Sequence, residues 1–548
     1  MKQYSLGLDF GTNSVRALLV DCADGREVAT SVFQYPSGNA GVIEDPRDPN
    51  LARQNPADYF EGVEHTVRDA LQAAHDAEPG FSVHQVVGIG TDTTGSSPTP
   101  IQADGTPLAF MNSDPAAMCW LWKDHTSYAE AAEITEKATA FGYTDNIGGT
   151  YSSEWFWSKI LHCARTAPDV FSQAHSWCEF QDLIPAYLTG NQNPKTMARG
   201  VCAAGHKGMY NPKWGGLPST EFLSQLDPRV ADLRSRLYEK AVPASESAGR
   251  LSQERAQSLG LSEQTQVAVG AMDAHLGAVG SGVKPGTLVK IMGTSTCDIM
   301  VGDASVPNIP GVCGIVDGSV IPGMMGIEAG QSAVGDLFNW AASKLAQGKT
   351  HEELTSESAN QAPGASGLIA LDWNNGNRTI LVDQRLSGLL IGQSLQTTAA
   401  EIYRAMIEAT AFGALTIIRR IEEYGVKIEE IVCCGGIAEK SPLAMQIYTD
   451  VCNRPIKLSR SAQTCALGAA IMGSVVGGAH PDVSTAIAAM TGVKDTVYQP
   501  NPQAVLTYQR LYKLYVDLHD AFGNTARNPD LHGAMKELLA IRDSARQA

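Results

Sequence analysis

The segment GLDFGTNSVRALLVD, residues 7–21, contains an apolar strand, a Gly-Thr turn and a second apolar strand. The segment IMGTSTCDIMVGD, residues 291–303, repeats this pattern in the second half of the chain. Glycine and short side chains at such a turn let backbone N–H groups face a phosphate at close range. The pattern therefore predicts a duplicated hairpin, with each copy able to bind phosphate.

The first hairpin is followed by elements that can be recognised from their boundaries. A strand is expected at residues 27–34, and a long helix opens at Asn55, an N-cap residue, with Pro56 at the first helical position. A buried strand is expected next, at residues 86–91. This order, hairpin, strand, helix and buried strand, is typical of an α/β unit.

The second half repeats much of this order. A helix begins at the capping box Thr398-x-x-Glu401, and a buried strand follows at residues 430–434. Both halves then close with a strand and a helix of small residues, at residues 267–280 and 465–478. We therefore predict an α/β fold of two duplicated domains with a cleft between them.

The composition is that of a globular chain with a sizeable core. Of the 548 residues, 43% are hydrophobic and 18% are charged. The 41 basic and 58 acidic residues give 41 − 58 = −17. This balance argues against nucleic acid or an anionic membrane as a partner, because both would repel the surface as a whole. A local pocket for an anion is still compatible with it.

Cysteine usage and the length of the apolar runs suggest an intracellular protein. The 11 cysteines include no C-x-x-C pair, so neither a disulfide framework nor a zinc site is expected. The N-terminus reaches a glycine turn too early for a secretory signal. The longest small-apolar stretch, residues 465–479, falls short of the roughly 20 residues that cross a bilayer. We expect a cytoplasmic protein without a membrane partner.

Familiar nucleotide-binding loops are missing from the sequence. Gly348-Lys349-Thr350 resembles the end of a Walker loop, but the glycine required five residues earlier is replaced by Ser343. No G-x-G-x-x-G is present either. A nucleotide would therefore have to be bound by the duplicated hairpins.

Several further segments, in order, resemble the FGGY carbohydrate kinases of the actin-like ATPase superfamily. The resemblance extends from residue 4 to about residue 515, and within the family it is strongest to members that phosphorylate ribulose. The segments that carry it, besides the two hairpins, are GTDTTGSSPTP (90–100), LWKDHT (121–126), CEFQDLIPAYLTG (178–190), AAGHKGMYN (203–211), GAMDAHLGAVGSG (270–282) and CCGGIAEKSPLAMQ (433–446).

The resemblance implies a fold, a reaction and a domain division. The fold would be two actin-like ATPase (ribonuclease H-like) domains, with residues 1–283 carrying a sugar-binding insertion at about 92–264. Residues 284–548 would form the ATP-binding half and a C-terminal helical segment. The reaction would be transfer of phosphate from ATP, with magnesium, to the 5-hydroxyl of ribulose, as L-ribulose in L-arabinose breakdown. The family further suggests a homodimer.

Two aspartates carry the expected chemistry. Asp9 ends the first strand beside a phosphate-binding turn and is expected to hold magnesium; otherwise it would accept backbone N–H bonds. The second hairpin has Ile291 at the matching position, which suits a single metal. Asp273 lies where a small-residue strand meets a helix, and in FGGY kinases the matching aspartate is the general base. Its alternative role is that of an N-cap.

The remaining candidates bind ATP or sugar. Arg16 is equally compatible with added charge beside the γ-phosphate or with a solvated strand residue. Candidates for the β- and γ-phosphates are Gly11, Thr12, Gly293, Thr294, Ser295 and Thr296. Gly435 and Gly436 would give adenosine access to the backbone, or simply form a close strand-helix turn. Candidates for the sugar site are Gly95 and Ser96 in a tight loop, together with Lys207, Glu328 and Asp273, which match sugar-contacting positions in the family.

Aromatic and histidine residues near these motifs leave alternatives open. Aromatic residues between Trp120 and Trp157 suit either sugar stacking or the core of the insertion, and Trp122-Lys123-Asp124 is placed at the pocket rim. His206 and His275 lack a second histidine at ligand spacing in sequence, so packing or hydrogen bonding is expected. The C-terminal segment 508–516 is expected to be helical and to contact either the body or another subunit.

Two other functions fit the same motifs. One is a different FGGY kinase, acting on xylulose, ribitol or glycerol. The other is a non-catalytic, sugar-responsive ATP-binding protein, which would keep the Gly-Thr turns but would not need a base at Asp273.

Overall fold

The first predicted hairpin lies in the N-terminal sheet. The structure is a computed structural model that describes residues 2–346, 348–524, 526–527 and 529–547. The sheet has the order β10-β11-β6-β1-β2-β3, and β12 also pairs with β6. β2 is antiparallel to β1, whereas β6 and β11 run parallel to it. The strands are β1 (Tyr4–Phe10), β2 (Ser14–Asp21), β3 (Glu27–Gln34), β6 (Val86–Thr93), β10 (Ser247–Arg250), β11 (Gln266–Ala268) and β12 (Ala271–Met272).

The C-terminal sheet repeats this arrangement around the second hairpin. Its order is β15-β16-β14-β13-β19-β20-β21, with β14 antiparallel to β13 and with β19 and β20 parallel to it. The order β3-β2-β1-β6-β11 thus matches β16-β14-β13-β19-β20, which confirms the predicted duplicated α/β fold. The strands are β13 (Thr287–Met292), β14 (Thr296–Gly302), β15 (Gly314–Asp317), β16 (Met325–Ala329), β19 (Glu430–Cys434), β20 (Ile456–Ser459) and β21 (Val493–Tyr498).

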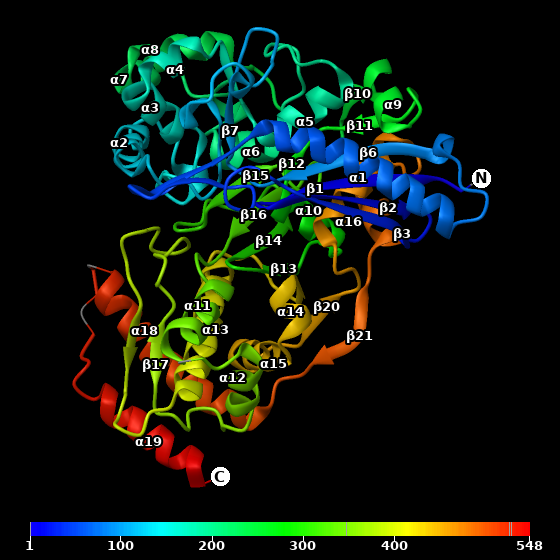
Figure 1. Cartoon of the computed structure of the whole chain (residues 1–548). Coiled ribbons are helices and arrows are strands. Elements are labelled where there is room, and N and C mark those ends of the chain that lie inside the picture. Colours follow the sequence, from blue (N-terminus) through cyan, green and yellow to red (C-terminus); the bar gives the residue numbers. More distant parts are fainter. Residues whose placement is uncertain (1, 347, 525, 528, 548) are drawn as a thin grey trace.

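Two helices of small residues join the halves. In Figure 1, α10 (Asp273–Gly280) and α16 (Thr464–Val476) lie between the blue-to-green upper half and the green-to-red lower half. α16 packs on β1 and β6 of the N-terminal sheet, and α10 contacts β13 and β14 of the other. A Cβ on Gly468 would lie 1.8 Å from the Leu276 carbonyl oxygen. Small residues are therefore needed for α10 and α16 to pack against each other.

The segment between β6 and β10 builds a helical layer beside the N-terminal sheet, at the top left of Figure 1. Its core contains Trp120, Trp157 and Trp177, all buried. Its elements are β7 (Pro98–Ile101), β8 (Cys119–Trp120), α2 (Tyr128–Thr139), α3 (Phe156–Thr166), α4 (Pro168–Gln173), β9 (Ser176–Glu179), α5 (Phe180–Thr189), α6 (Val201–Lys207), α7 (Thr220–Leu226) and α8 (Pro228–Leu233).

The predicted helix starts are confirmed. α1 (Pro56–Ala77) begins where Asn55 accepts a hydrogen bond from the Ala57 backbone N–H, and α13 (Ala399–Glu423) begins at the Thr398–Glu401 capping box. α18 (Pro502–Gly523) packs back on the body, where the Tyr515 hydroxyl donates to Asp372 at 2.9 Å. Within the described residues, no helix combines the length and the apolar character that crossing a bilayer requires.

Candidate active site

Three aspartates meet at one edge of the N-terminal sheet. Asp9 and Asp92 are paired positions on the parallel strands β1 and β6. Asp273 directly follows β12, in which Ala271 pairs with Asp92. The carboxyl ends of parallel strands lie at the same edge of a sheet. The three carboxylates are therefore close together in space although they are far apart in sequence. Asp92 is fully buried, and neither of its carboxylate oxygens has a hydrogen-bond partner among the described residues.

Burial and mutual repulsion set the ionisation of these carboxylates. Burial raises the pKa of Asp273 to about 7, and the charge of Asp9 adds to this effect. Burial also raises the pKa of Asp9. The pKa of Asp92 lies well above its usual range, mainly because the group is buried and further because the negative charges of Asp9 and Asp273 repel its own. A proton acceptor with a pKa near neutral suits general-base catalysis. A cluster of buried carboxylates is in turn stabilised by a bound cation.

A single pocket brings most of the predicted site residues together. It encloses about 1150 Å³, including open solvent at its mouth. Asp273 lines it together with residues from the tips of both hairpins. The predicted residues that line it are Thr12, Gly95, Lys207, Asp273, Gly293, Thr294, Ser295 and Glu328. Asp9, Gly11, Ser96, Gly435 and Gly436 do not line this pocket.

The hairpin tips are held in place by hydrogen bonds to neighbouring elements. In the first hairpin, Thr12 accepts through its carbonyl from the Gln54 side chain at 2.7 Å and through its hydroxyl from the Trp122 indole N–H at 3.0 Å. In the second, the carbonyl of Thr294 accepts from the Val334 N–H at 2.8 Å, just before α11 (Gly335–Trp340). A Cβ on Gly293 would meet no atom closer than 3.8 Å, so the space beside this turn is open.

Gly435 and Gly436 lie beside the second hairpin but outside the pocket. They join the end of β19 to α14 (Gly436–Lys440), and β19 pairs with β13. Gly435 has φ +91, and a Cβ there would lie 2.6 Å from the Met292 carbonyl oxygen. A Cβ on Gly436 would meet no atom of the described residues within 4 Å. Gly435 therefore serves the close turn, whereas Gly436 leaves a surface open to a ligand.

Lys207 and Glu328 form a buried ion pair between the two halves. The Lys207 Nζ donates to both carboxylate oxygens of Glu328, at 2.7 and 2.9 Å. Burial alone would raise the pKa of Glu328, but the neighbouring groups, the Lys207 ammonium first among them, together outweigh burial and hold that pKa well below its usual range. Lys207 comes from the end of α6 and Glu328 from β16. The pair therefore presents fixed charge of both signs at the pocket wall.

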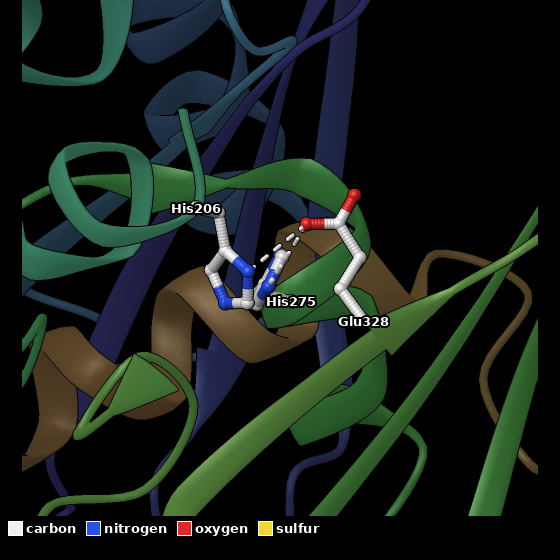
Figure 2. A group of neighbouring side chains, drawn as sticks. All are labelled: His206, His275 and Glu328. Carbon is white, nitrogen blue, oxygen red and sulfur yellow. Dashed lines mark ion pairs between the residues drawn. The ribbon is translucent and has the colours of Figure 1, made fainter. Parts of the chain in front are cut away.

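Figure 2 shows that two histidine rings converge on the same carboxylate. The Oε2 of Glu328 lies 3.3 Å from the His206 Nδ1 and 3.8 Å from the His275 Nε2. Burial lowers the pKa of His275 to about 4 and that of His206 well below its usual range, so both rings are neutral near pH 7. Spatially the group has the dimensions of a cation site, with ligand atoms within 4.8 Å of one another.

The Lys207 ammonium weighs against a metal at these histidines. It already neutralises Glu328, and a divalent ion beside it would add uncompensated positive charge in a buried place. His206 further contacts the Ser319 hydroxyl through Nε2 at 3.1 Å. Packing and hydrogen-bonding roles for His206 and His275 stay our prediction.

Ser96 faces away from the pocket. It is fully buried; its hydroxyl donates to Glu179, and its carbonyl accepts from the Lys159 Nζ at 2.9 Å. The Ser97 N–H also donates to Glu179, at 2.8 Å. The protein itself thus uses these polar groups, and it is the neighbouring Gly95 that lines the pocket.

The aromatic residues are divided between the pocket and the core of the helical layer, and sugar stacking stays a prediction. Trp122 and Trp155 line the pocket, and the Lys207 Nζ lies 5.2 Å from the Trp155 ring centre. Trp157 is in the core of the helical layer. The placement of Asp124 at the rim is wrong, because Asp124 is fully buried and pairs with Arg53. A charged residue next to a pocket aromatic can point into the protein interior when a buried residue of opposite charge lies there to pair with it.

Sequence reasoning missed three charged residues near this site. Asp92 lies in the quoted segment 90–100, and its position at a strand end beside Asp9 is a signal that could have found it. Glu154 and Arg378 line the pocket from segments far apart in sequence. Neither belongs to a motif with a chemical meaning of its own, so no local signal identified them.

Comparisons with known proteins agree with this geometry. The FGGY family of carbohydrate kinases matches through its N-terminal domain at residues 4–280 and through its C-terminal domain at residues 288–476. The chain is 39% identical to a ribulokinase of Vibrio parahaemolyticus, over 94% of this chain and 95% of the relative. It is also 39% identical to a ribulokinase of Halalkalibacterium halodurans, over 98% of both chains.

Solved structures with the same fold include other sugar and polyol kinases. A ligand-bound xylulose kinase from Lactobacillus acidophilus superposes with a TM-score of 0.80 at 22% identity, covering 95% of this chain and 99% of that one. A Plasmodium falciparum glycerol kinase with ADP superposes with a TM-score of 0.76 at 14% identity, covering 94% and 98%. On these matches of family and fold, the chain belongs to the FGGY family of carbohydrate kinases.

Proposed function

We propose that this protein is an ATP-dependent ribulokinase that converts L-ribulose to L-ribulose 5-phosphate. The observation that carries the proposal is the single pocket lined by the tips of both hairpins, by Asp273 and by the Lys207–Glu328 pair. A phosphoryl-transfer site needs anion-binding turns, a proton acceptor and groups that orient the acceptor hydroxyl. The relatives named above as ribulokinases support ribulose as that acceptor.

Asp273 is assigned the role of general base. Its Oδ1 accepts the Ala274 N–H at 2.6 Å, which orients the carboxylate at the start of α10. The other oxygen is then available to accept the proton of the 5-hydroxyl as that oxygen attacks the γ-phosphate. Lys207 and Glu328, on the same pocket wall, would donate to and accept from the sugar hydroxyls.

Asp9 is assigned to magnesium, with Asp92 beside it. Two unpartnered, buried carboxylate oxygens on Asp92 fit a site that is completed by a cation. When bound, the ion neutralises charge on the ATP phosphates. Arg16, which pairs with Asp9 across the first hairpin, adds a positive charge at the same edge.

ATP is assigned to the second hairpin and the neighbouring turn. Gly293, Thr294 and Ser295 would contact the β- and γ-phosphates, and Gly11 with Thr12 would meet the γ-phosphate from the opposite hairpin. Gly435 and Gly436 would let the adenosine pack directly on the backbone, because they have no side chains. The division at residues 283 and 284 is proposed as the domain boundary, since the sheets lie on either side of it. The homodimer stays a prediction.

Gly436→Val is expected to weaken ATP binding without unfolding the protein. In the part of the chain that the structure describes, no atom lies within 4 Å of a Cβ at this position. The side chain therefore fits the protein but occupies the space assigned to the purine. We expect the KM for ATP to rise about tenfold or more while the KM for ribulose and the Tm change little. Steady-state kinetics with either substrate varied, and thermal unfolding, measure these values. An unchanged KM for ATP would remove Gly436 from the adenosine site.

The substrate assignment is tested by initial rates on a panel of acceptors. ADP release is measured with L-ribulose, D-ribulose, xylulose, ribitol and glycerol at fixed magnesium and ATP. We expect the highest kcat/KM with L-ribulose and negligible ADP release without an acceptor. A preference for glycerol or xylulose would overturn the subfamily assignment, and acceptor-independent ADP release would overturn the kinase assignment itself.

A further inference from the structure

A second ion pair crosses between the halves at the same pocket. The Arg378 guanidinium donates from Nη2 to the Glu154 Oε1 at 3.3 Å, and both side chains are largely buried, at 15% and 13% exposed. Glu154 belongs to the helical layer of the N-terminal half, and Arg378 to the loop that follows β17 (Ile369–Leu371) in the C-terminal half. Both residues line the pocket that contains Asp273.

Each residue of this pair lies near one residue of the Lys207–Glu328 pair: Glu154 near Lys207, and Arg378 near Glu328. Glu154 precedes Trp155, whose ring lies 5.2 Å from the Lys207 Nζ. On the other side, the Gly330 N–H, two residues beyond Glu328, donates at 2.9 Å to the hydroxyl of Thr379, which follows Arg378. Each half contributes one acidic and one basic residue: Glu154 and Lys207 come from the N-terminal half, and Glu328 and Arg378 from the C-terminal half.

The order of charges along the pocket places the second pair farther from the base. His275, two residues after Asp273 on α10, lies 3.8 Å from Glu328, and Glu328 is ion-paired with Lys207. The Lys207 Nζ in turn lies 5.2 Å from the ring of Trp155, the neighbour of Glu154. Lys207 and Glu328 therefore lie between the base and the second pair. A five-carbon sugar whose 5-hydroxyl faces Asp273 would direct its opposite end, carbon 1, toward Glu154 and Arg378.

The second pair has hydrogen-bonding capacity to spare. The Nε of Arg378 is buried and lacks a hydrogen-bond partner among the described residues. A guanidinium offers five N–H donors, and an ionised carboxylate accepts only. Burial alone would raise the pKa of Glu154, but the neighbouring positive groups, Arg378 first among them, together outweigh burial and lower that pKa, so the carboxylate is ionised. One hydroxyl group can donate to a carboxylate and accept from a guanidinium at the same time.

We propose that Glu154 and Arg378 bind the 1-hydroxyl of the pentulose, Glu154 as acceptor and Arg378 as donor. This inference rests on the proposed function, because it assumes that a pentulose fills the pocket with its 5-hydroxyl at Asp273. The interaction fixes the end of the sugar remote from the reaction. It also makes the ion pair between the halves part of the substrate site.

The proposal is tested by removing the hydroxyl from the substrate and its partners from the protein. The kcat/KM values of the wild type, Glu154→Gln and Arg378→Lys are measured with L-ribulose and with 1-deoxy-L-ribulose. For the wild type, loss of the hydroxyl is expected to lower kcat/KM about tenfold to a hundredfold, as for hydrogen bonds to charged groups. For both variants, ribulose should be used more poorly, and loss of the hydroxyl should have little further effect.

Arg385→Met is the matched control, because Arg385 belongs to the same segment but is exposed and lies outside the pocket. It should behave as the wild type with both substrates. If Glu154 and Arg378 have a purely structural role, their substitution lowers kcat/KM for both substrates by the same factor, and that result would overturn the proposal. A wild type with the same kcat/KM for L-ribulose and 1-deoxy-L-ribulose would also overturn it. A wild type inactive on ribulose would instead overturn the proposed function.

Discussion

Asp273→Asn is expected to lower kcat by about 10²- to 10⁴-fold, the range of a positioned general base. Asparagine has the same shape and can still accept the Ala274 N–H that orients Asp273 at the start of α10. It cannot take up a proton from the attacking hydroxyl. The dissociation constants for ATP and ribulose, measured by calorimetry, should therefore change little while single-turnover transfer nearly stops.

The pH dependence provides the control for this variant. Burial raises the pKa of Asp273 to about 7, and a base works only when it is deprotonated. Wild-type kcat/KM should therefore fall as pH decreases through about 7 and level off above it. The Asp273→Asn variant should lack this acid limb. If the variant turns over like the wild type, Asp273 has no part in the proton transfer.

Lys207→Met is expected to destabilise the protein by about 3–5 kcal/mol, the cost of breaking a buried ion pair from one side. It would leave the Glu328 carboxylate, 9% exposed, without the ammonium that now lies 2.7 Å away. The same substitution removes a charged hydrogen-bond donor from the sugar site. The kcat/KM for ribulose should drop by about tenfold to a hundredfold or more.

The double variant Lys207→Met with Glu328→Gln separates stability from function. Because no buried charge is left unpaired, most of the lost free energy of unfolding should return, as measured by urea denaturation. Activity on ribulose should stay low, since both sugar contacts are gone. A double variant that recovers activity together with stability would show that the pair supports the fold and does not recognise the sugar.

Much of the fold can be predicted from the sequence because it depends on patterns of residues that are close together in the chain. The hairpins, the Asn55 and Thr398 helix starts and the buried strand 430–434 each depend on residues close in sequence. The duplication followed from comparing the halves of the chain. Pocket residues such as Asp273 and Lys207 were found because they belong to segments that resemble a family.

The rest depends on contacts that sequence does not encode locally. Glu154 and Arg378 meet only because the helical layer and the C-terminal half pack together. Ser96 turns inward because Lys159 and Glu179, from α3 and the end of β9, hold its polar groups. Asp124 is likewise buried by an arginine 71 positions away. Each outcome is decided by a partner distant in the chain.

Asp273, in the pocket that both hairpins line, is proposed to receive the proton of a sugar hydroxyl that attacks the γ-phosphate. The most direct measurement is a crystal structure with L-ribulose, magnesium and an unreactive ATP analogue. We expect a carboxylate oxygen of Asp273 about 2.6–3.2 Å from the 5-hydroxyl, with that hydroxyl in line with the γ-phosphorus. A sugar bound with another hydroxyl, or none, within reach of Asp273 would contradict it.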